Sequence, residues 1–169
     1  MGGSAKSPYS SLGLGVAAVV AVLDQASKYW LVHLSGIAEA GGRLVLGPFV
    51  DLVNLRNPGV SYSMFELRGN AGQWALAALA LVVSAGIIWW LGRAANWLTA
   101  AALGLVLGGA AGNAIDRPLM GGVVDFVSLH AGGFNWYVFN IADIGIVVGA
   151  ALLLYESVLG SRKTATDGA

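Results

Sequence analysis

Two aspartates stand at positions where a charged side chain is unexpected. Asp125 lies in the stretch GGVVDFVSL and Asp143 in FNIADIGIV, and both stretches are otherwise mostly apolar. Two carboxylates held together in a low-dielectric site cannot both ionise easily, so one of them keeps a proton. The ionised member can take a proton from water while the protonated member polarises a carbonyl oxygen. These residue types indicate aspartic-type peptide hydrolysis, provided that the fold brings the two carboxylates together.

Helix capping is the alternative role for Asp143. Asn140 precedes it by three residues, so NIAD resembles a capping box with the aspartate in the third helical position. The helix macrodipole would favour the ionised carboxylate there. We therefore expect Asp143 to be the ionised member of the pair and Asp125 to hold the proton, with apparent pKa values that belong to both.

The composition indicates a membrane protein. Apolar residues make up 57% of the chain and charged residues 11%, whereas roughly a quarter of a typical soluble domain is charged. Four apolar runs, over residues 12–34, 73–91, 97–115 and 141–159, approach the roughly 20 residues that a membrane-spanning helix needs. The first could be a secretory signal, but it continues past Asp24 without a convincing cleavage site. The predicted fold is an all-α four-transmembrane-helix bundle.

The connection over residues 35–72 differs from the apolar runs. It contains RLVLG and FVDLVNLR, which are rich in β-branched and aliphatic residues and are punctuated by Pro48, Pro58 and several glycines. We expect a small extramembrane β region here, with residues 60–70 as a mobile lid. No long-period repeat or hinge-like linker divides the chain, so residues 1–169 are expected to form a single membrane domain.

Polar residues concentrate at one end of the predicted bundle. In an up-down arrangement, the end of the first helix, the first loop, the end of the third helix and the start of the fourth share one side. The unusual polar residues and glycines there are Asp24, Lys28, Asn57, Gly59, Asn113, Asp116, Arg117, Asp125, Asn140 and Asp143. The basic residues of the short segments at the other side mildly favour both termini inside.

Asp24 and Lys28 are spaced as i and i+4, the orientation that supports a helical ion pair. Ionisable groups within a membrane helix are costly and are functional candidates by default. We expect a supporting structural role for this pair. In the alternative, the pair merely neutralises itself and Lys28 extends toward the lipid headgroups.

Asn113, Asp116 and Arg117 lie three and four residues apart, so they share one face of a helix. Pro118 disfavours helical geometry at the residue before it, which predicts that the third helix ends near Arg117. The alternative to a functional site is a C-terminal cap, in which Arg117 meets the last carbonyls and Asp116 meets its guanidinium.

Glycines recur at four-residue spacing in GLVLGGAAGN, and the fourth run repeats this spacing with Gly145 and Gly149. Small residues at this spacing let helix backbones approach closely, so helix packing is the expected role for most of them. Gly109 and Gly112, close to Asn113, could also let a substrate backbone approach.

Several function classes are excluded or disfavoured. The net charge is zero, which removes the basic face that nucleic-acid binding needs. The absence of cysteine excludes disulfides, thiolate metal sites and a cysteine nucleophile. There is no G-x-S-x-G or HExxH motif, and His33 and His130 lie far apart in the sequence. Two alternatives remain: an ion pathway built on the buried charges, and a scaffold that recruits helices through its glycine faces.

Five stretches together resemble the lipoprotein signal peptidase family, also called signal peptidase II. They are LDQASK at 23–28, NPGVSYSMF at 57–65, GGAAGNAIDR at 108–117, GGVVDF at 121–126 and FNIAD at 139–143. They occur in the family's order and cover nearly the whole chain. One departure is NPGVSYS, where many members have a pattern like N-T-G-A-A-F-S. Pro58 stiffens this loop, so its detailed shape over the site is open.

The resemblance implies a bacterial inner-membrane aspartic endopeptidase that removes the signal peptide from prolipoproteins, cutting before the diacylglyceryl-modified cysteine. Asp125 and Asp143 match the family's catalytic pair. Positions associated with substrate or inhibitor contact are Asn57, Gly59, Asn113 and Arg117, and supporting positions are Asp24, Lys28, Asp116 and Asn140. The resemblance also implies cytoplasmic termini, a site at the periplasmic face, no metal cofactor and inhibition by globomycin. Membrane lipids are expected partners, and the chain is expected to act as a monomer.

Overall fold

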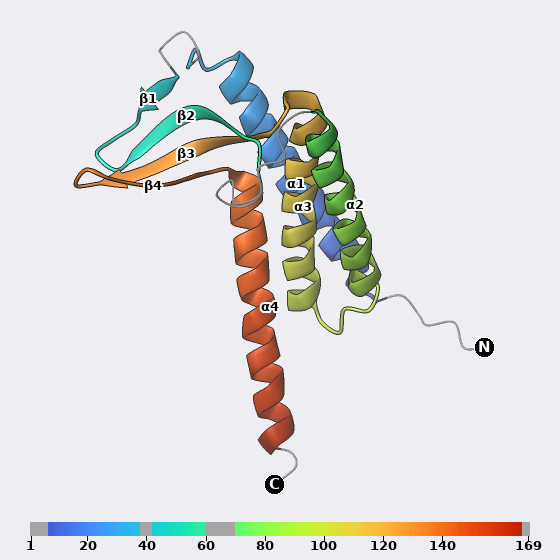
Figure 1. Cartoon of the computed structure of the whole chain (residues 1–169). Helices are drawn as coiled ribbons and strands as arrows, with labels where there is room; N and C mark the ends of the chain where they lie inside the picture. The colour runs from blue at the N-terminus through green and yellow to red at the C-terminus, as the bar shows by residue number, and fades with distance from the viewer. Residues whose placement is uncertain (1–6, 38–41, 60–69, 167–169) are drawn as a thin grey trace.

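The structure, a computed structural model, describes residues 7–37, 42–59 and 70–166 (Figure 1). In chain order its elements are α1 (Ser10–His33), β1 (Arg43–Val45), β2 (Val50–Asn57), α2 (Asn70–Leu91), α3 (Trp97–Met120), β3 (Val123–Ala131), β4 (Phe134–Phe139) and α4 (Ile141–Thr166). Among the described residues, four helices are long and apolar enough to cross a membrane. The predicted fold class is therefore confirmed. Of the predicted lid, residues 60–69 lie outside the described residues.

Helix α3 forms the centre of the bundle. In its apolar span 61% of the residues are buried, against 22% or less in the other three helices. Its buried residues Ala100 and Leu103 pack with Ala17 of α1 and Leu91 of α2 in one apolar cluster. The outer helices expose large apolar side chains such as Val82, as expected for helices whose solvent is lipid.

The glycines of α3 allow two neighbouring helices to approach closely. A Cβ atom added to Gly108 would lie 2.5 Å from the carbonyl oxygen of Ala17 in α1, and one added to Gly109 would lie 2.3 Å from that of Ala142 in α4. Adjacent glycines therefore serve opposite helices, as small-residue packing in membranes predicts. Gly109 packs against α4 and is not among the described residues that line the cavity beside Asp125 and Asp143.

The sheet is larger than the sequence analysis predicted. Four antiparallel strands lie in the order β1-β2-β3-β4, and the last two come from the connection between α3 and α4, outside the predicted β region of 35–72. A tight turn at Gly132 and Gly133, with φ of +56° and +81°, joins them. Positive φ at both central residues is typical of a two-residue hairpin turn. The sheet projects sideways from one end of the bundle, and β4 leads directly into α4 (Figure 1).

Two boundaries also differ from the predictions. Helix α3 continues through Pro118 to Met120, so the predicted end at Arg117 is wrong. The proline removes one N–H, but Gly121 ends the helix in the left-handed conformation and donates its N–H to the carbonyl oxygen of Arg117. Helix α4 extends to Thr166, beyond its predicted end at residue 159. After α3 the chain continues into β3. A buried apolar cluster that includes Leu31 of α1 and Val124 of β3 joins these two elements.

Candidate active site

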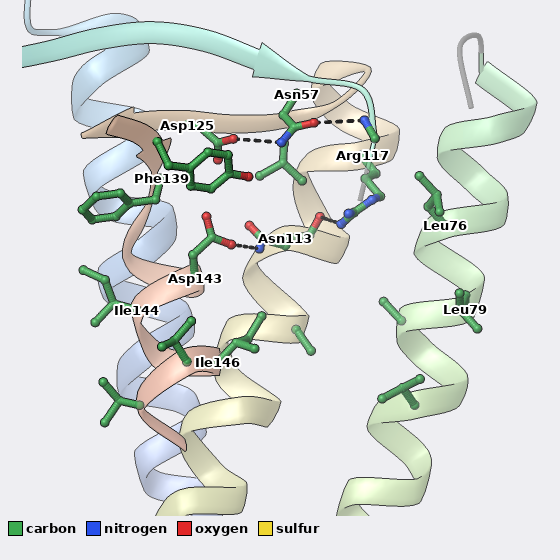
Figure 2. A pocket seen from close by; sticks show the side chains of 18 residues that line it. Asn57, Leu76, Leu79, Asn113, Arg117, Asp125, Phe139, Asp143, Ile144 and Ile146 are labelled. Carbon is green, nitrogen blue, oxygen red and sulfur yellow. Dashed lines mark hydrogen bonds between the residues drawn. The ribbon is translucent and has the colours of Figure 1, made fainter. Parts of the chain in front are cut away.

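A cavity of about 590 Å³ opens where α2, α3 and α4 meet the sheet (Figure 2). Its polar wall contains the side chains of Asn57, Asn113, Arg117, Asp125 and Asp143. The facing walls, from α2 and α4, are apolar. The two aspartates, which lie eighteen positions apart in the sequence, therefore border the same space.

Asp125 reaches the cavity from β3 and is only 1% exposed. Asn57 donates to its Oδ2 at 3.1 Å and Asn140 donates to its Oδ1 at 2.7 Å. Burial, and next the nearby charge of Asp143, raise the pKa of Asp125 to about 7, and the two amide hydrogen bonds only partly oppose this. Asp125 can therefore keep its proton near neutral pH, as the sequence analysis expected.

Asp143 lies in the first turn of α4. Its N–H donates to Oδ1 of Asn140 at 2.9 Å, and its Oδ2 accepts the N–H of Asn140 at 3.3 Å. This reciprocal pair confirms the predicted capping box. The other oxygen, Oδ1, accepts the side-chain amide of Asn113 at 2.9 Å. Capping and a place in the cavity are compatible, because different oxygens of the carboxylate make these contacts.

Asn140 contacts both aspartates and is fully buried. Besides its bonds to Asp125 and Asp143, its Nδ2 lies 3.1 Å from Oδ1 of Asn113 and 3.3 Å from the carbonyl oxygen of Val124. An amide nitrogen carries two hydrogens, so these contacts share them. Asn140 and Asn113 thus form one connected network with the two carboxylates.

Behind this network, Lys28 forms ion pairs with two aspartates. Its Nζ lies 2.7 Å from Oδ2 of Asp24 and 2.7 Å from Oδ2 of Asp116. The lysine is 3% exposed, so the alternative in which it extends to the headgroups is wrong. In the capping alternative Asp116 would meet the guanidinium of Arg117, but its ion pair is with Lys28 of α1. Arg117 does donate to a carbonyl oxygen of the last turns, that of Asn113 at 2.7 Å, as this alternative expected, and it also lines the cavity.

The first residues after β2, Pro58 and Gly59, lie beside the cavity. Gly59 lines the cavity and donates its N–H to Oδ1 of Asn57 at 3.0 Å, which closes a tight turn around Pro58. Gln73, buried at the start of α2, donates to the carbonyl oxygen of Pro58 at 2.7 Å. The structure thus places Asn57 and Gly59 beside the two aspartates.

Sequence reasoning missed three groups of residues at this site. Gln73 is a polar residue at the start of an apolar run, which was the available signal. Tyr137 and Phe139 of β4 both line the cavity, and their two-residue spacing, which places them on one face of a strand, was the available signal. Gln25 lies within LDQASK and donates to Oδ1 of Asp116 at 2.9 Å. Within the described ranges, no group of three or more metal-ligating side chains could hold a metal ion.

Comparisons with known proteins agree with this geometry. A family model described as signal peptidase (SPase) II matches residues 16–159. This chain belongs to that family. It is 47% identical to the lipoprotein signal peptidase of Methylocella silvestris, over 93% of this chain and 91% of the relative. It is 51% identical to that of Beijerinckia indica, over 80% and 81% of the two chains.

Two solved structures share the fold, and both are described as bacterial membrane enzyme structures obtained by the in meso method. One has a TM-score of 0.76 at 24% identity and covers 94% of each chain. The other has a TM-score of 0.74 at 26% identity and covers 91% of this chain and 97% of its own. The chain is therefore a multi-pass membrane protein and a protease, and the aspartic type fits the family. Membership supports the removal of signal peptides from prolipoproteins and disfavours the ion-pathway and scaffold alternatives.

Proposed function

We propose that this signal peptidase II cuts prolipoproteins immediately before the diacylglyceryl-modified cysteine, with Asp125 and Asp143 as the catalytic pair. One observation carries this proposal: two carboxylates in unlike surroundings border one cavity whose facing walls are apolar. Unlike environments push the pKa values of such a pair apart, which gives each member a different task.

In the proposed reaction, ionised Asp143 takes a proton from water as the water oxygen attacks the scissile carbonyl carbon. Asp125 donates its proton to the carbonyl oxygen, which gives a neutral tetrahedral intermediate. When the intermediate collapses, the C–N bond breaks, Asp143 passes its proton to the leaving amine, and Asp125 recovers its own from the hydroxyl. The pair ends in its starting state. The amide donors Asn113 and Asn140 hold both carboxylates in place throughout.

The apolar walls suit a substrate that arrives within the membrane. Leu79 of α2 and Val147 of α4 line the cavity, yet they are 58% and 66% exposed. The cavity is therefore continuous with the surface that faces lipid. A signal helix and a diacylglyceryl group could reach the aspartates by lateral diffusion, and the apolar walls would keep bulk water low.

We assign the remaining residues by their contacts. The cavity-lining group proposed to contact substrate or a globomycin-type cyclic peptide comprises Asn57, Gly59, Asn113 and Arg117. The group proposed to support the site comprises Asp24, Lys28, Gly109, Asp116 and Asn140.

The proposed location is the bacterial inner membrane, with both termini cytoplasmic and the site at the periplasmic face. The N–H of Ser7 before α1 donates to the carbonyl oxygen of Gly92 in the α2–α3 connection, which supports opposite ends of the bundle for the start of α1 and the site. We further propose one membrane domain, since β3 packs on α1. We propose that it works as a monomer, since described residues of one chain supply both aspartates and the apolar residues around them.

The test is cleavage of a diacylglyceryl-modified prolipoprotein in detergent by the wild type, Asp125→Asn and Asp143→Asn, with globomycin as inhibitor. Both variants should lose at least about 10³-fold in rate, because neither can complete the proton transfers. Asp51→Asn is the matched control, since Asp51 is an equally buried aspartate of β2 that contacts Arg43 and His130 away from the cavity. A folded Asp125 or Asp143 variant with near wild-type activity would remove that residue from the pair.

A further inference from the structure

The backbone that carries Asp143 is held by a residue of another helix. The N–H of Ala142, the residue before Asp143, donates to Oδ1 of Asp24 in α1 at 3.0 Å. The first N–H groups of a helix have no partner within the helix, so a carboxylate from α1 satisfies one of them here. Asp24 therefore fixes where α4 begins relative to α1.

The backbone that carries Asp125 is held in the same way. The N–H of Val124, the residue before Asp125, donates to Oδ2 of Asp116 at 3.1 Å. Asp116 lies in the last turns of α3 and is buried. A second carboxylate, that of Asp116, thus fixes the position of β3 relative to α3, one residue before Asp125.

Lys28 joins these two anchors. An ammonium has three donors, and those of Lys28 lie near Asp24 and Asp116, both at 2.7 Å, and Oδ1 of Asn113 at 3.2 Å. Asn113 in turn donates to Asp143. Each of the three partners of Lys28 thus makes one further hydrogen bond toward the proposed catalytic pair. Asp24 binds the N–H of the residue before Asp143, Asp116 binds the N–H of the residue before Asp125, and Asn113 binds Asp143 itself.

Stability alone explains this arrangement poorly. Burying charges costs several kcal/mol per ion before their attraction is counted, and apolar replacements of buried ion pairs are often neutral or stabilising. The surroundings are nevertheless shaped around the charges. Gln25 contacts Oδ2 of Asp24 at 3.2 Å and Oδ1 of Asp116 at 2.9 Å, and a Cβ atom added to Gly112 would lie 2.4 Å from Oδ2 of Asp24.

We propose that Lys28 is a positioning residue that, by clamping Asp24 to Asp116, sets the separation and orientation of the two catalytic aspartates. This lysine clamp, made of Asp24, Lys28 and Asp116, rests on the proposed catalytic pair. None of its three residues is among the described residues that line the cavity, and it acts through the backbone N–H groups before the pair and through Asn113.

The first test is Lys28→Met, which keeps an unbranched side chain only one atom shorter and removes its donors. Since small misplacements of catalytic groups cost up to about 10²-fold, kcat on the prolipoprotein should fall about 10–100-fold while KM changes little. The matched control is Thr99→Val, which removes the hydrogen bond from the buried Thr99 to Glu156, at the end of α3 away from the cavity. This control should lower thermal stability without changing kcat.

The pH profile separates positioning from general stabilisation. The pKa of Asp125 responds chiefly to burial and to the charge of Asp143, and the charge of Lys28 lowers it. The other titratable groups at the cavity are Arg117 of α3 and Tyr137 of β4, and Asp24 and Asp116 lie beside Lys28. Without Lys28 the pKa of Asp125 rises, so the alkaline limb of kcat/KM should move to higher pH in Lys28→Met and stay in place in Thr99→Val.

A second pair of variants decides the matter if Lys28→Met does not fold. Asp116→Asn keeps an oxygen that can accept the N–H of Val124, whereas Asp116→Ala does not. The alanine variant should lose about 10-fold more kcat than the asparagine variant, because only the asparagine variant keeps an acceptor for the N–H of Val124. Unchanged kcat and pH profile in folded Lys28→Met, or equal activities for the two Asp116 variants, would overturn the proposal. The same assay also contains the wild type and the Asp125 and Asp143 variants. If the wild type does not cleave the prolipoprotein, the proposed function is refuted, and this result is distinct from a failure of the lysine clamp.

Discussion

Asp125 and Asp143 are the same residue type in different surroundings, and this difference gives them different chemistry. Asp125 is enclosed by β2, β3 and the start of α4, with two amide donors as its partners. Asp143 lies in the first turn of α4, where its N–H donates to the N-cap residue Asn140 and its carboxylate accepts the N–H of Asn140. Burial favours the neutral carboxyl at Asp125, whereas the carboxylate of Asp143 accepts an N–H group at the start of a helix. The asymmetry therefore comes from the backbone that carries each residue.

The raised pKa of Asp125 predicts a pH-dependent cost in stability. Its pKa is about 7 in the folded protein and 3.8 ordinarily, so between these values the folded state binds more protons than the unfolded state. The wild type should then lose stability as pH rises from about 4 to about 7. Asp125→Asn lacks this titration.

Melting temperatures in detergent between pH 4 and pH 8 provide the measurement. The melting temperature of Asp125→Asn minus that of the wild type should increase with pH, by roughly 2–4 °C for each kcal/mol of linked stability. Asp51→Asn serves as the control for a buried aspartate outside the cavity. A difference that stays constant across this range would mean that Asp125 does not hold a proton at neutral pH.

The contacts of Asn140 predict that its replacement lowers activity in addition to removing a helix cap. Asn140→Ala removes the donor to Asp125 and the cap of α4, so kcat/KM should fall about 10–100-fold. Its hydrogen bond lowers the pKa of Asp125, so the alkaline limb of the pH profile should move to higher pH. Asn96→Ala removes the equivalent cap of α3, which accepts the N–H of Thr99. Each variant should lose about 1 kcal/mol of stability, and activity should fall in Asn140→Ala alone. Equal activities in the two variants would limit Asn140 to capping.

At the scale of elements, the helices were the most predictable part of the fold. Apolar runs of membrane-spanning length allow few other structures, and the glycine spacing of α3 showed where helices approach closely. The hairpin β3–β4 was missed because a short apolar, β-branched segment between two membrane helices is difficult to distinguish from an irregular connection. The end of α3 was misplaced because the preference of a residue before proline is weaker than the contacts that hold the last turn.

The close contact at Gly109 predicts that the site forms only when α3 and α4 pack tightly. A Cβ atom there would meet the carbonyl oxygen of Ala142 at 2.3 Å, so Gly109→Ala should push the first turn of α4 away from α3. We expect a lower melting temperature and at least about 10-fold lower activity, since that turn carries Asp143. Gly15→Ala on α1 is the control, because nothing lies within 4 Å of the added atom. Equal behaviour of the two variants would show that α4 adjusts freely.

At the scale of the whole molecule, the gathering of polar residues at one end was predictable and their pairing was not. Alternating helix directions place the end of one helix beside the start of another, whatever the rotation of each helix. Rotation decides the partners, which is why Asp116 binds Lys28 rather than the adjacent Arg117. The distribution of basic residues is a weak guide to which membrane side holds this end.

The absence of cysteine from the chain allows this orientation to be measured with single introduced cysteines. Phe49→Cys, in the exposed loop between β1 and β2, marks the end that carries the cavity. Ala95→Cys, exposed between α2 and α3, marks the other end. With an intact inner membrane, a membrane-impermeant maleimide should label Phe49→Cys, and Ala95→Cys should react only after permeabilisation. The cysteine-free wild type controls for background. The reverse pattern would place the aspartates on the cytoplasmic side, where a signal peptide still joined to an exported lipoprotein does not present its cleavage site.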